Sequence, residues 1–216
     1  MEAITESIKV EHVFDGVIKI VFPSFSELAK AFLRFQEYQE SPEFRGKVFT
    51  QEEFLIWYNN ISGKNYLEEW EAFNLSPQAI RPFLEGKFNP LYPEEKIILE
   101  VIKSFQDSYL IGIAEPTKIE DELHEIAHAL YYKNQEYKKE VDDLLKQLDK
   151  KAREEIVKFL SRGGAYHPDV WEDEAHAYIM FNLSYMEEEC VNLNENNIRE
   201  MGIKLRQVFD KYYKLK

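Results

Sequence analysis

The chain has 216 residues, of which 44% are hydrophobic and 31% are charged, a composition typical of globular rather than disordered proteins. Its formal net charge of −13 argues against nucleic acid or an anionic membrane surface as a partner, because both attract basic proteins. The acidic balance is compatible with a neutral or basic polypeptide substrate, or it serves solubility alone.

The single cysteine, Cys190, excludes an intramolecular disulfide and a cysteine-rich structural zinc site. Residues 1–6 lack the basic and apolar regions of a secretory signal. No apolar run approaches the roughly 18 residues that a membrane span needs. We therefore expect a cytoplasmic protein that does not enter the membrane, and the sequence gives no indication of its oligomeric state.

The first predicted elements are a β-hairpin and a helix. Residues 8–14 and 17–22 are rich in β-branched and aromatic side chains. They flank Asp15-Gly16, which is a preferred two-residue hairpin turn. A helix is predicted to begin near Phe25, because apolar residues then recur at helical spacing.

Three further helices are predicted from their start signals. Thr50 and Glu53 have the spacing of a capping box, Ser76-Pro77 pairs an N-cap with proline at the first helical position, and Pro93 opens a third helix. Five aromatic residues of this region either pack in the core, which is the interpretation we favour, or line a substrate groove. They are Trp57, Tyr58, Tyr66, Trp70 and Phe73.

The rest of the chain is predicted to contain one short strand and several helices. Residues 109–113 form the strand, and Thr117 with Glu120 has the pattern of a second capping box. The apolar spacing over 141–160 predicts one long helix or two in tandem, stopped at the glycine pair 163–164. Two last helices cover about 168–186 and 196–213.

These elements predict an α+β fold that is mainly helical. Its β-structure is a small N-terminal hairpin and a short strand that precedes the metal-binding helix described next. We place a looser boundary near residue 90, between an N-terminal α+β lobe (1–90) and a helical metal-binding lobe (91–216), although the two lobes can also form one compact unit.

The motif His124-Glu125-Ile126-Ala127-His128 carries the chemistry of the chain. On a helix, His124 and His128 lie one turn apart on the same face, so that both imidazoles can reach one zinc ion. Glu125 can then act as a base on a water molecule at the metal. The apolar residues of this helix cluster on its other side, which leaves a polar face for the histidines. The alternative is two surface histidines on an ordinary amphipathic helix.

At these residues the sequence resembles the zincin metallopeptidases, in which an extended strand precedes the motif helix. The metzincin branch needs a glycine and a third histidine soon after the motif, and here Ala129-Leu130 follows His128. Peptide deformylases use a cysteine upstream of the motif, whereas Cys190 lies downstream. The resemblance is therefore to the gluzincins, in which a glutamate on a later helix completes the zinc site.

The third ligand implied by this resemblance is Glu174. The segment Glu174-Ala175-His176-Ala177 is similar to the Glu-x-x-Ala pattern of some gluzincins. Glu174 also shares a helical stripe with Trp171 and Tyr178, so it is expected to face inward, where a carboxylate needs a partner. Glu172 and His176 lie on other faces and remain the alternatives.

An open zinc site has a characteristic mechanism. Three protein ligands leave room for a water molecule, whose pKa the metal lowers towards about 7. Glu125 accepts its proton and later delivers it to the leaving amine. A second donor must stabilise the tetrahedral intermediate. Our candidates are Tyr166 and His167, with Tyr178 behind them, although a buried structural role is an alternative for each.

The resemblance also implies how a substrate is held. In zincin-like enzymes an extended peptide adds to the edge of the sheet beside the motif helix. We predict that the strand at 109–113 has one free edge for this pairing, and that Gly112 allows close approach of a backbone. The alternative is an interior strand that is paired on both sides.

The sequence thus predicts a zinc-dependent metallopeptidase. Two alternatives stay open: a non-catalytic, metal-stabilised binding module, and a metal hydrolase that acts on a non-peptide amide. Glu125 favours catalysis, because a purely structural zinc site does not need a carboxylate next to its first ligand.

Overall fold

The computed structural model describes residues 8–162, 166–189 and 195–214. The chain divides into two compact units, Met1–Lys118 and Ile119–Lys216, which are described separately. The predicted fold class, α+β and mainly helical, is confirmed. The boundary expected near residue 90 falls inside the first unit, because the helix and strand that follow it pack on the N-terminal elements.

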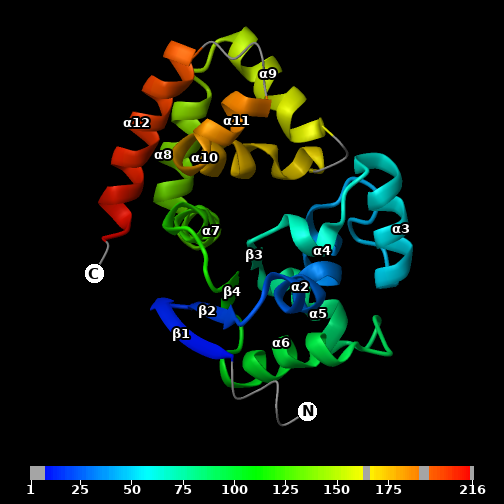
Figure 1. The fold of residues 1–216 in the computed structure, drawn as a ribbon. Helices are drawn as coiled ribbons and strands as arrows, with labels where there is room; N and C mark the ends of the chain where they lie inside the picture. Colours follow the sequence, from blue (N-terminus) through cyan, green and yellow to red (C-terminus); the bar gives the residue numbers. More distant parts are fainter. Residues whose placement is uncertain (1–7, 163–165, 190–194, 215–216) are drawn as a thin grey trace. The chain divides into compact units, whose positions relative to one another are not determined.

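The first unit contains a four-stranded sheet in the order β1-β2-β4-β3 (Figure 1). The predicted hairpin is confirmed: β1 (Lys9–Phe14) and β2 (Val17–Phe22) are antiparallel, and Gly16 supplies the positive φ of 71° in their turn. Strand β4 (Tyr109–Ala114) runs parallel to β2, and β3 (Ala72–Leu75) is antiparallel to β4.

The predicted free edge of the strand at 109–113 is wrong. Strand β4 is paired on both sides, and all six of its residues are buried. The edge of β4 that was expected to be free is paired with β3, a strand that was not predicted from the sequence. In this pairing Phe73 lies opposite Gly112. A Cβ atom on Gly112 would overlap the Phe32 ring and lie 2.8 Å from Leu28 Cδ1. This glycine therefore makes room for the helix packed on the sheet, not for a substrate.

Three helices of the first unit begin at the start signals predicted from the sequence. The Thr50–Glu53 capping box forms, and the Ser76 hydroxyl accepts from the backbone N–H of Ala79. The helices of this unit are α2 (Phe25–Glu40), α3 (Gln51–Ser62), α4 (Tyr66–Glu69), α5 (Pro77–Leu84) and α6 (Pro93–Ser104).

The aromatic residues of the first unit form its core, as favoured from the sequence. Tyr58, Tyr66 and Phe73 belong to the buried cluster, and Trp57 and Trp70 pack against it. Tyr66 packs edge-on against Tyr58, with centroids 5.1 Å apart, and makes tilted ring contacts with Trp70 and Phe73. The groove interpretation is therefore dropped.

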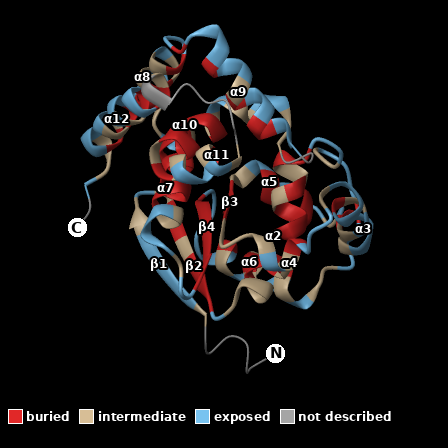
Figure 2. Cartoon of the chain, turned by 45° about the horizontal axis from the view of Figure 1, so that its top comes forward, coloured by how far each residue is buried: buried red, intermediate tan, exposed pale blue. Residues whose placement is uncertain are grey.

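The second unit is helical over its described residues. Helices α7 and α10 pack against each other, as do α8 and α12. Their buried residues show as the red parts of these helices in Figure 2. The elements are α7 (Ile119–Lys133), α8 (Gln135–Leu145), α9 (Lys150–Ser161), the 3-10 turn η2 (Pro168–Val170), α10 (Trp171–Phe181), α11 (Leu183–Glu189) and α12 (Glu195–Tyr212).

Three boundaries of the later elements differ from or refine the predictions. The segment 141–160 belongs to two helices in tandem, and the predicted stop at residues 163–164 lies outside the described residues. The helix expected over 168–186 is interrupted at Asn182. Helix α7 begins at Ile119, and the Thr117 hydroxyl donates to the carbonyl oxygen of Ala114 instead of capping the helix.

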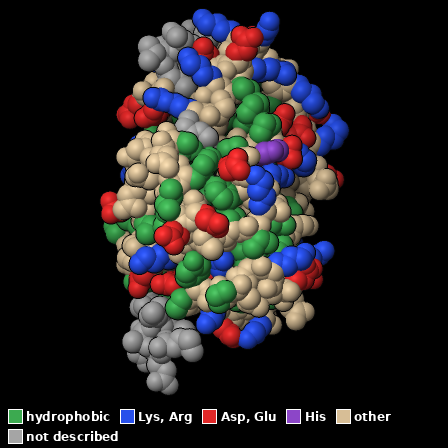
Figure 3. All heavy atoms as spheres, turned by 90° about the vertical axis from the view of Figure 1, so that its right-hand side faces the viewer, with side chains coloured by type: hydrophobic (Ala, Val, Ile, Leu, Met, Phe, Trp, Pro, Cys, Tyr) green, Lys and Arg blue, Asp and Glu red, His purple; other side chains and the backbone are tan. Residues whose placement is uncertain are grey.

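The surface carries both signs of charge. On the face drawn in Figure 3, acidic and basic side chains are interspersed among apolar ones. Oppositely charged side chains also form exposed ion pairs along the chain, such as Lys139 with Asp143 at 2.6 Å. Of the helices in the described ranges, none combines the length and apolar composition that a membrane crossing requires.

Candidate metal centre

Helix α7 places the motif residues in a buried environment. The exposed fractions are 8% for His124, 6% for Glu125 and 1% for His128. Every residue from 123 to 131 is buried, so the polar side of this helix faces other parts of the protein and not solvent. The helical spacing of the two histidines keeps their rings together, with centroids 4.8 Å apart.

Helix α10 brings Glu174 to the two histidines. His124 Nε2 lies 3.9 Å from Glu174 Oε2, and His128 Nε2 lies 3.6 Å from Glu174 Oε1. One potential ligand atom from each residue lies within 4.8 Å of the others. These separations exceed hydrogen-bond distances, and the donor atoms converge on a common centre. The structure thus assembles the three residues that the sequence nominated as ligands.

The two alternative ligands are arranged differently. Glu172 is exposed on the outer side of α10. His176 is buried, but its Nδ1 donates to the carbonyl oxygen of Asp173, in the preceding turn of the same helix. The group of potential ligands found among the described residues contains neither of them.

Each histidine of the group is held from behind by a hydrogen bond. His128 Nδ1 donates to Asp173 Oδ1 at 2.7 Å, and His124 Nδ1 donates to Asn182 Oδ1 at 2.7 Å. The Asn182 amide is fixed in turn, because its Nδ2 donates to Asp121 Oδ1 at 2.9 Å. With a proton on Nδ1, both neutral rings leave the Nε2 lone pair for a metal, the arrangement common to metal-binding histidines.

Asp173 and Asn182 were not predicted from the sequence as parts of this centre. Asp173 immediately precedes the third ligand, and an acidic neighbour of that ligand is a signal that could have been used, since ligating histidines usually donate to a carboxylate or carbonyl. Asn182 depends on the break between α10 and α11, which has no clear local signal.

Burial sets the protonation states of the centre. It lowers the pKa of His128 to about 3, and burial together with the neighbouring His128 lowers the pKa of His124 well below its ordinary value. Both imidazoles are therefore neutral at physiological pH, which is the form that binds metal. Burial also raises the pKa of Asp173 to about 7, although His176 and Lys138 oppose that shift.

One tyrosine of a hydrogen-bonded pair lies beside His124. The Tyr178 ring packs edge-on against His124, with centroids 4.8 Å apart. Its hydroxyl lies 2.8 Å from that of Tyr166, the tyrosine nominated from the sequence. Burial raises the pKa of Tyr178 well above its ordinary value, and the charges of Glu174 and Glu125 add to the effect. Tyr178 therefore keeps its proton, and Tyr166 reaches the centre through it.

His167, the other nominated donor, has a local structural contact. It is the N-cap of η2, and its Nδ1 accepts the backbone N–H of Asp169 at 3.2 Å. The described contacts of His167 are with Asp169, not with the three potential ligands. Tyr178, which the sequence placed behind His167, is the one that touches a histidine of the centre.

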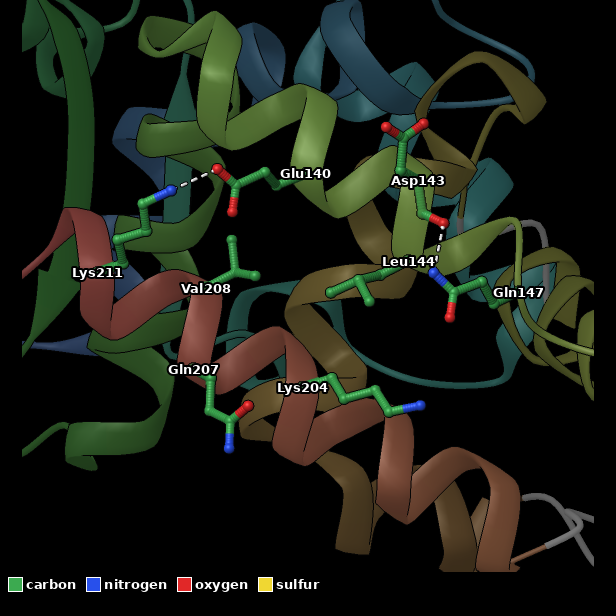
Figure 4. A pocket seen from close by; sticks show the side chains of 8 residues that line it. All are labelled: Glu140, Asp143, Leu144, Gln147, Lys204, Gln207, Val208 and Lys211. Carbon is green, nitrogen blue, oxygen red and sulfur yellow. Dashed lines mark hydrogen bonds and ion pairs between the residues drawn. The ribbon is translucent and has the colours of Figure 1, made fainter.

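A groove of about 440 Å³ between α8 and α12 is separate from these residues (Figure 4). Leu144 and Val208 contribute apolar surface to it, and charged residues line both sides. Its acids already have partners: Glu140 pairs with Lys211 at 2.6 Å, and Asp143 pairs with Lys139 of α8 and with Lys146, the residue after α8. None of the residues nominated from the sequence lines this groove.

Comparison with known proteins gives no match to a family model, to a curated protein or to a solved structure.

Proposed function

We propose that the protein is a zinc-dependent metallopeptidase of the gluzincin type. The observation that carries the proposal is the convergence of His124, His128 and Glu174, with their ligand atoms within 4.8 Å of one another. Glu125 supports a hydrolytic role, because a buried carboxylate that follows the first ligand in the sequence can serve as a general base.

The donor set fits a zinc ion. Two imidazole nitrogens and one carboxylate oxygen are a common set of protein ligands in catalytic zinc sites. Bonds of about 2.0–2.2 Å in a tetrahedron imply ligand separations of roughly 3.4 Å. The histidine nitrogens lie 3.6 and 3.9 Å from the two different oxygens of Glu174, and one ligand atom from each of the three residues lies within 4.8 Å of the others. Binding of zinc would draw these side chains closer together.

The roles of the other residues follow from their positions. When bound, zinc would supply the Lewis-acid chemistry that makes water a nucleophile near neutral pH. Glu125 accepts the proton of the attacking water and returns it to the leaving amine. Tyr178, which keeps its proton at neutral pH, donates a hydrogen bond to the developing oxyanion, and Tyr166 orients that hydroxyl. Asp173 and Asn182 orient the imidazoles.

The proposed substrate is a polypeptide and the proposed location is the cytoplasm. The formal net charge of −13 favours neutral or basic peptides over nucleic acid, because like charges repel. The gluzincin resemblance supplies the reaction class. A binding module without catalysis and a hydrolase of non-peptide amides are the outcomes that the following experiment separates from it.

The test is the substitution Glu125→Gln, which keeps side-chain size and removes the proton acceptor. We expect the variant to bind zinc like the wild type while its cleavage of a peptide library falls by about 10²–10⁴-fold. Glu120→Gln, at an exposed position of the same helix, is the control and should cleave normally. If the wild type cleaves no peptide but hydrolyses a non-peptide amide, and Glu125→Gln loses that activity, the protein is the amide hydrolase. A zinc-loaded wild type without either activity supports the binding module.

A further inference from the structure

The carboxylate that orients His128 is itself positioned between two imidazoles. Asp173 Oδ1 lies 2.7 Å from His128 Nδ1 and 3.5 Å from His176 Nδ1. The same Nδ1 of His176 donates to the main-chain carbonyl oxygen of Asp173. His176 thus contacts both the backbone and the side chain of the residue that holds a potential metal ligand.

The His176 ring is fixed by its surroundings. Its side chain is fully buried, and the ring stacks on Tyr131 with a centroid distance of 4.9 Å and an interplanar angle of 25°. Tyr131 is anchored in turn, because its hydroxyl donates to Asp142 Oδ1 at 2.5 Å. His176 Nδ1 therefore points at Asp173 in a defined direction, and little rotation of the ring is possible without disturbing these contacts.

Packing alone does not explain a histidine at this position. Its Nε2 is buried and has no hydrogen-bond partner among the described residues. Leaving a buried polar nitrogen without a hydrogen bond destabilises the folded state, and an apolar ring of similar size would avoid this penalty. A histidine at this position is explained if its other nitrogen, Nδ1, makes contacts that an apolar ring cannot make.

We propose that His176 is a positioning residue of the metal centre, which holds Asp173 so that His128 directs Nε2 towards Glu174. The zinc-binding consequence of this role rests on the proposed function, whereas its effect on His128 does not. Without His176 Nδ1, the Asp173 main-chain carbonyl loses its hydrogen bond and the carboxylate loses its 3.5 Å contact. The carboxylate can then turn away from His128, which loses its fixed tautomer and orientation.

Three substitutions separate positioning from packing. His176→Asn keeps a donor near the place of Nδ1, His176→Gln moves the donor towards the place of Nε2, and His176→Phe keeps a ring without any donor. Zinc affinity is measured by competition with a chelator, together with the visible spectrum of the cobalt-loaded protein. We expect the Asn variant to remain near wild type, and the Gln and Phe variants to bind zinc about 10–100-fold more weakly with an altered cobalt spectrum.

A second measurement uses the zinc-free protein. The Nδ1 proton of His128, hydrogen-bonded to Asp173, should give a slowly exchanging NMR signal in the wild type and in His176→Asn. We expect the signal to shift or broaden in His176→Phe while thermal unfolding shows that the variant is folded. If Phe does not fold, the comparison of Asn with Gln decides by the same signal.

The outcomes distinguish the two proposals. If the wild type binds no zinc, the metallopeptidase proposal is refuted. The positioning role is retained in that case if the wild type shows the His128 signal and His176→Phe or His176→Gln loses it. Unchanged zinc affinity, cobalt spectrum and His128 signal in both the Phe and the Gln variant overturn the positioning role and leave the metallopeptidase intact.

Discussion

Both units bury ionisable side chains, but they arrange them in opposite ways. In the first unit Arg34 faces Glu95 with two hydrogen bonds, of 2.6 Å from Nε to Oε1 and 2.5 Å from Nη2 to Oε2. Further N–H groups of Arg34 donate to the carbonyl oxygens of Phe49 and Phe88. In the second unit the histidine and glutamate atoms of the proposed metal centre stand 3.6–3.9 Å apart.

The difference lies in where the hydrogen bonds are made. The charges of Arg34 and Glu95 satisfy each other, so this pair is complete without a ligand. In the second unit, His124 and His128 make their hydrogen bonds on the side away from Glu174, with Asn182 and Asp173. Burial of ionisable groups is therefore by itself a weak sign of function. A stronger sign is that several atoms able to bind a metal point towards one another.

The largest expected effect is on stability, from breaking the Arg34–Glu95 ion pair of the first unit. Arg34→Met leaves the buried Glu95 carboxylate without its cation, so we expect the free energy of unfolding to fall by about 3–5 kcal/mol. Denaturant unfolding measures this loss, and Arg34→Met/Glu95→Leu should recover most of it. Lys47→Met, which removes a cation from an exposed pair with Glu43, is the control and should change stability by less than about 1 kcal/mol. A small effect of Arg34→Met would contradict the distinction between the two units.

The next effect is a pH dependence of the first unit. Burial raises the pKa of Glu37 to about 8, although a hydrogen bond with Tyr66 opposes the shift. Between pH 5 and 7 the unfolded chain ionises Glu37 while the folded unit keeps the proton, so stability falls as pH rises, by about 2–3 kcal/mol. Hydrogen exchange read over the first unit measures this slope. Glu37→Gln should flatten it, and an unchanged slope in that variant would show that Glu37 is not its source.

The second unit is expected to respond to pH with the opposite sign. Burial lowers the pKa of His128 to about 3, whereas its pKa in the unfolded chain is near 6.5. Below pH 6.5 the unfolded chain therefore binds a proton at His128 that the folded unit does not bind. Without metal, stability should therefore fall as pH decreases, by about 2 kcal/mol between pH 6.5 and 5 for this residue. Hydrogen exchange over α7 and α10 in the presence of a chelator measures it. His128→Gln should reduce the slope by one proton, and a wild type with no slope would refute the buried neutral state.

Local signals predicted most of the fold. The hairpin at Gly16 and the helix starts at Thr50, Ser76 and Pro93 depend on residues adjacent in sequence, and each appears in the structure. Strand β3 was missed because four residues with one asparagine carry little periodicity. Its strand conformation depends on pairing with β4, about 40 residues further along the chain, which no local pattern reports.

The candidate site was predictable to the extent that helix geometry defines it. The four-residue spacing of His124 and His128, and the inward stripe of Glu174, led to residues that the structure brings together. The hydrogen bonds that orient the histidines connect different helices, so they required the packing of α7 on α10. His167 was nominated from its nearness in sequence to the third-ligand helix, which does not determine where its side chain points.

The most direct test of the proposed metal centre is the zinc content of the purified protein. The wild type, Glu174→Gln and Glu172→Gln are purified, stripped, reloaded with zinc in the same way and analysed for metal per chain. We expect one zinc in the wild type and in Glu172→Gln, and a far lower content in Glu174→Gln, because Glu174, unlike Glu172, belongs to the group of potential ligands with the two histidines. A wild type without zinc, or a Glu174→Gln variant that keeps zinc while Glu172→Gln loses it, would contradict the account.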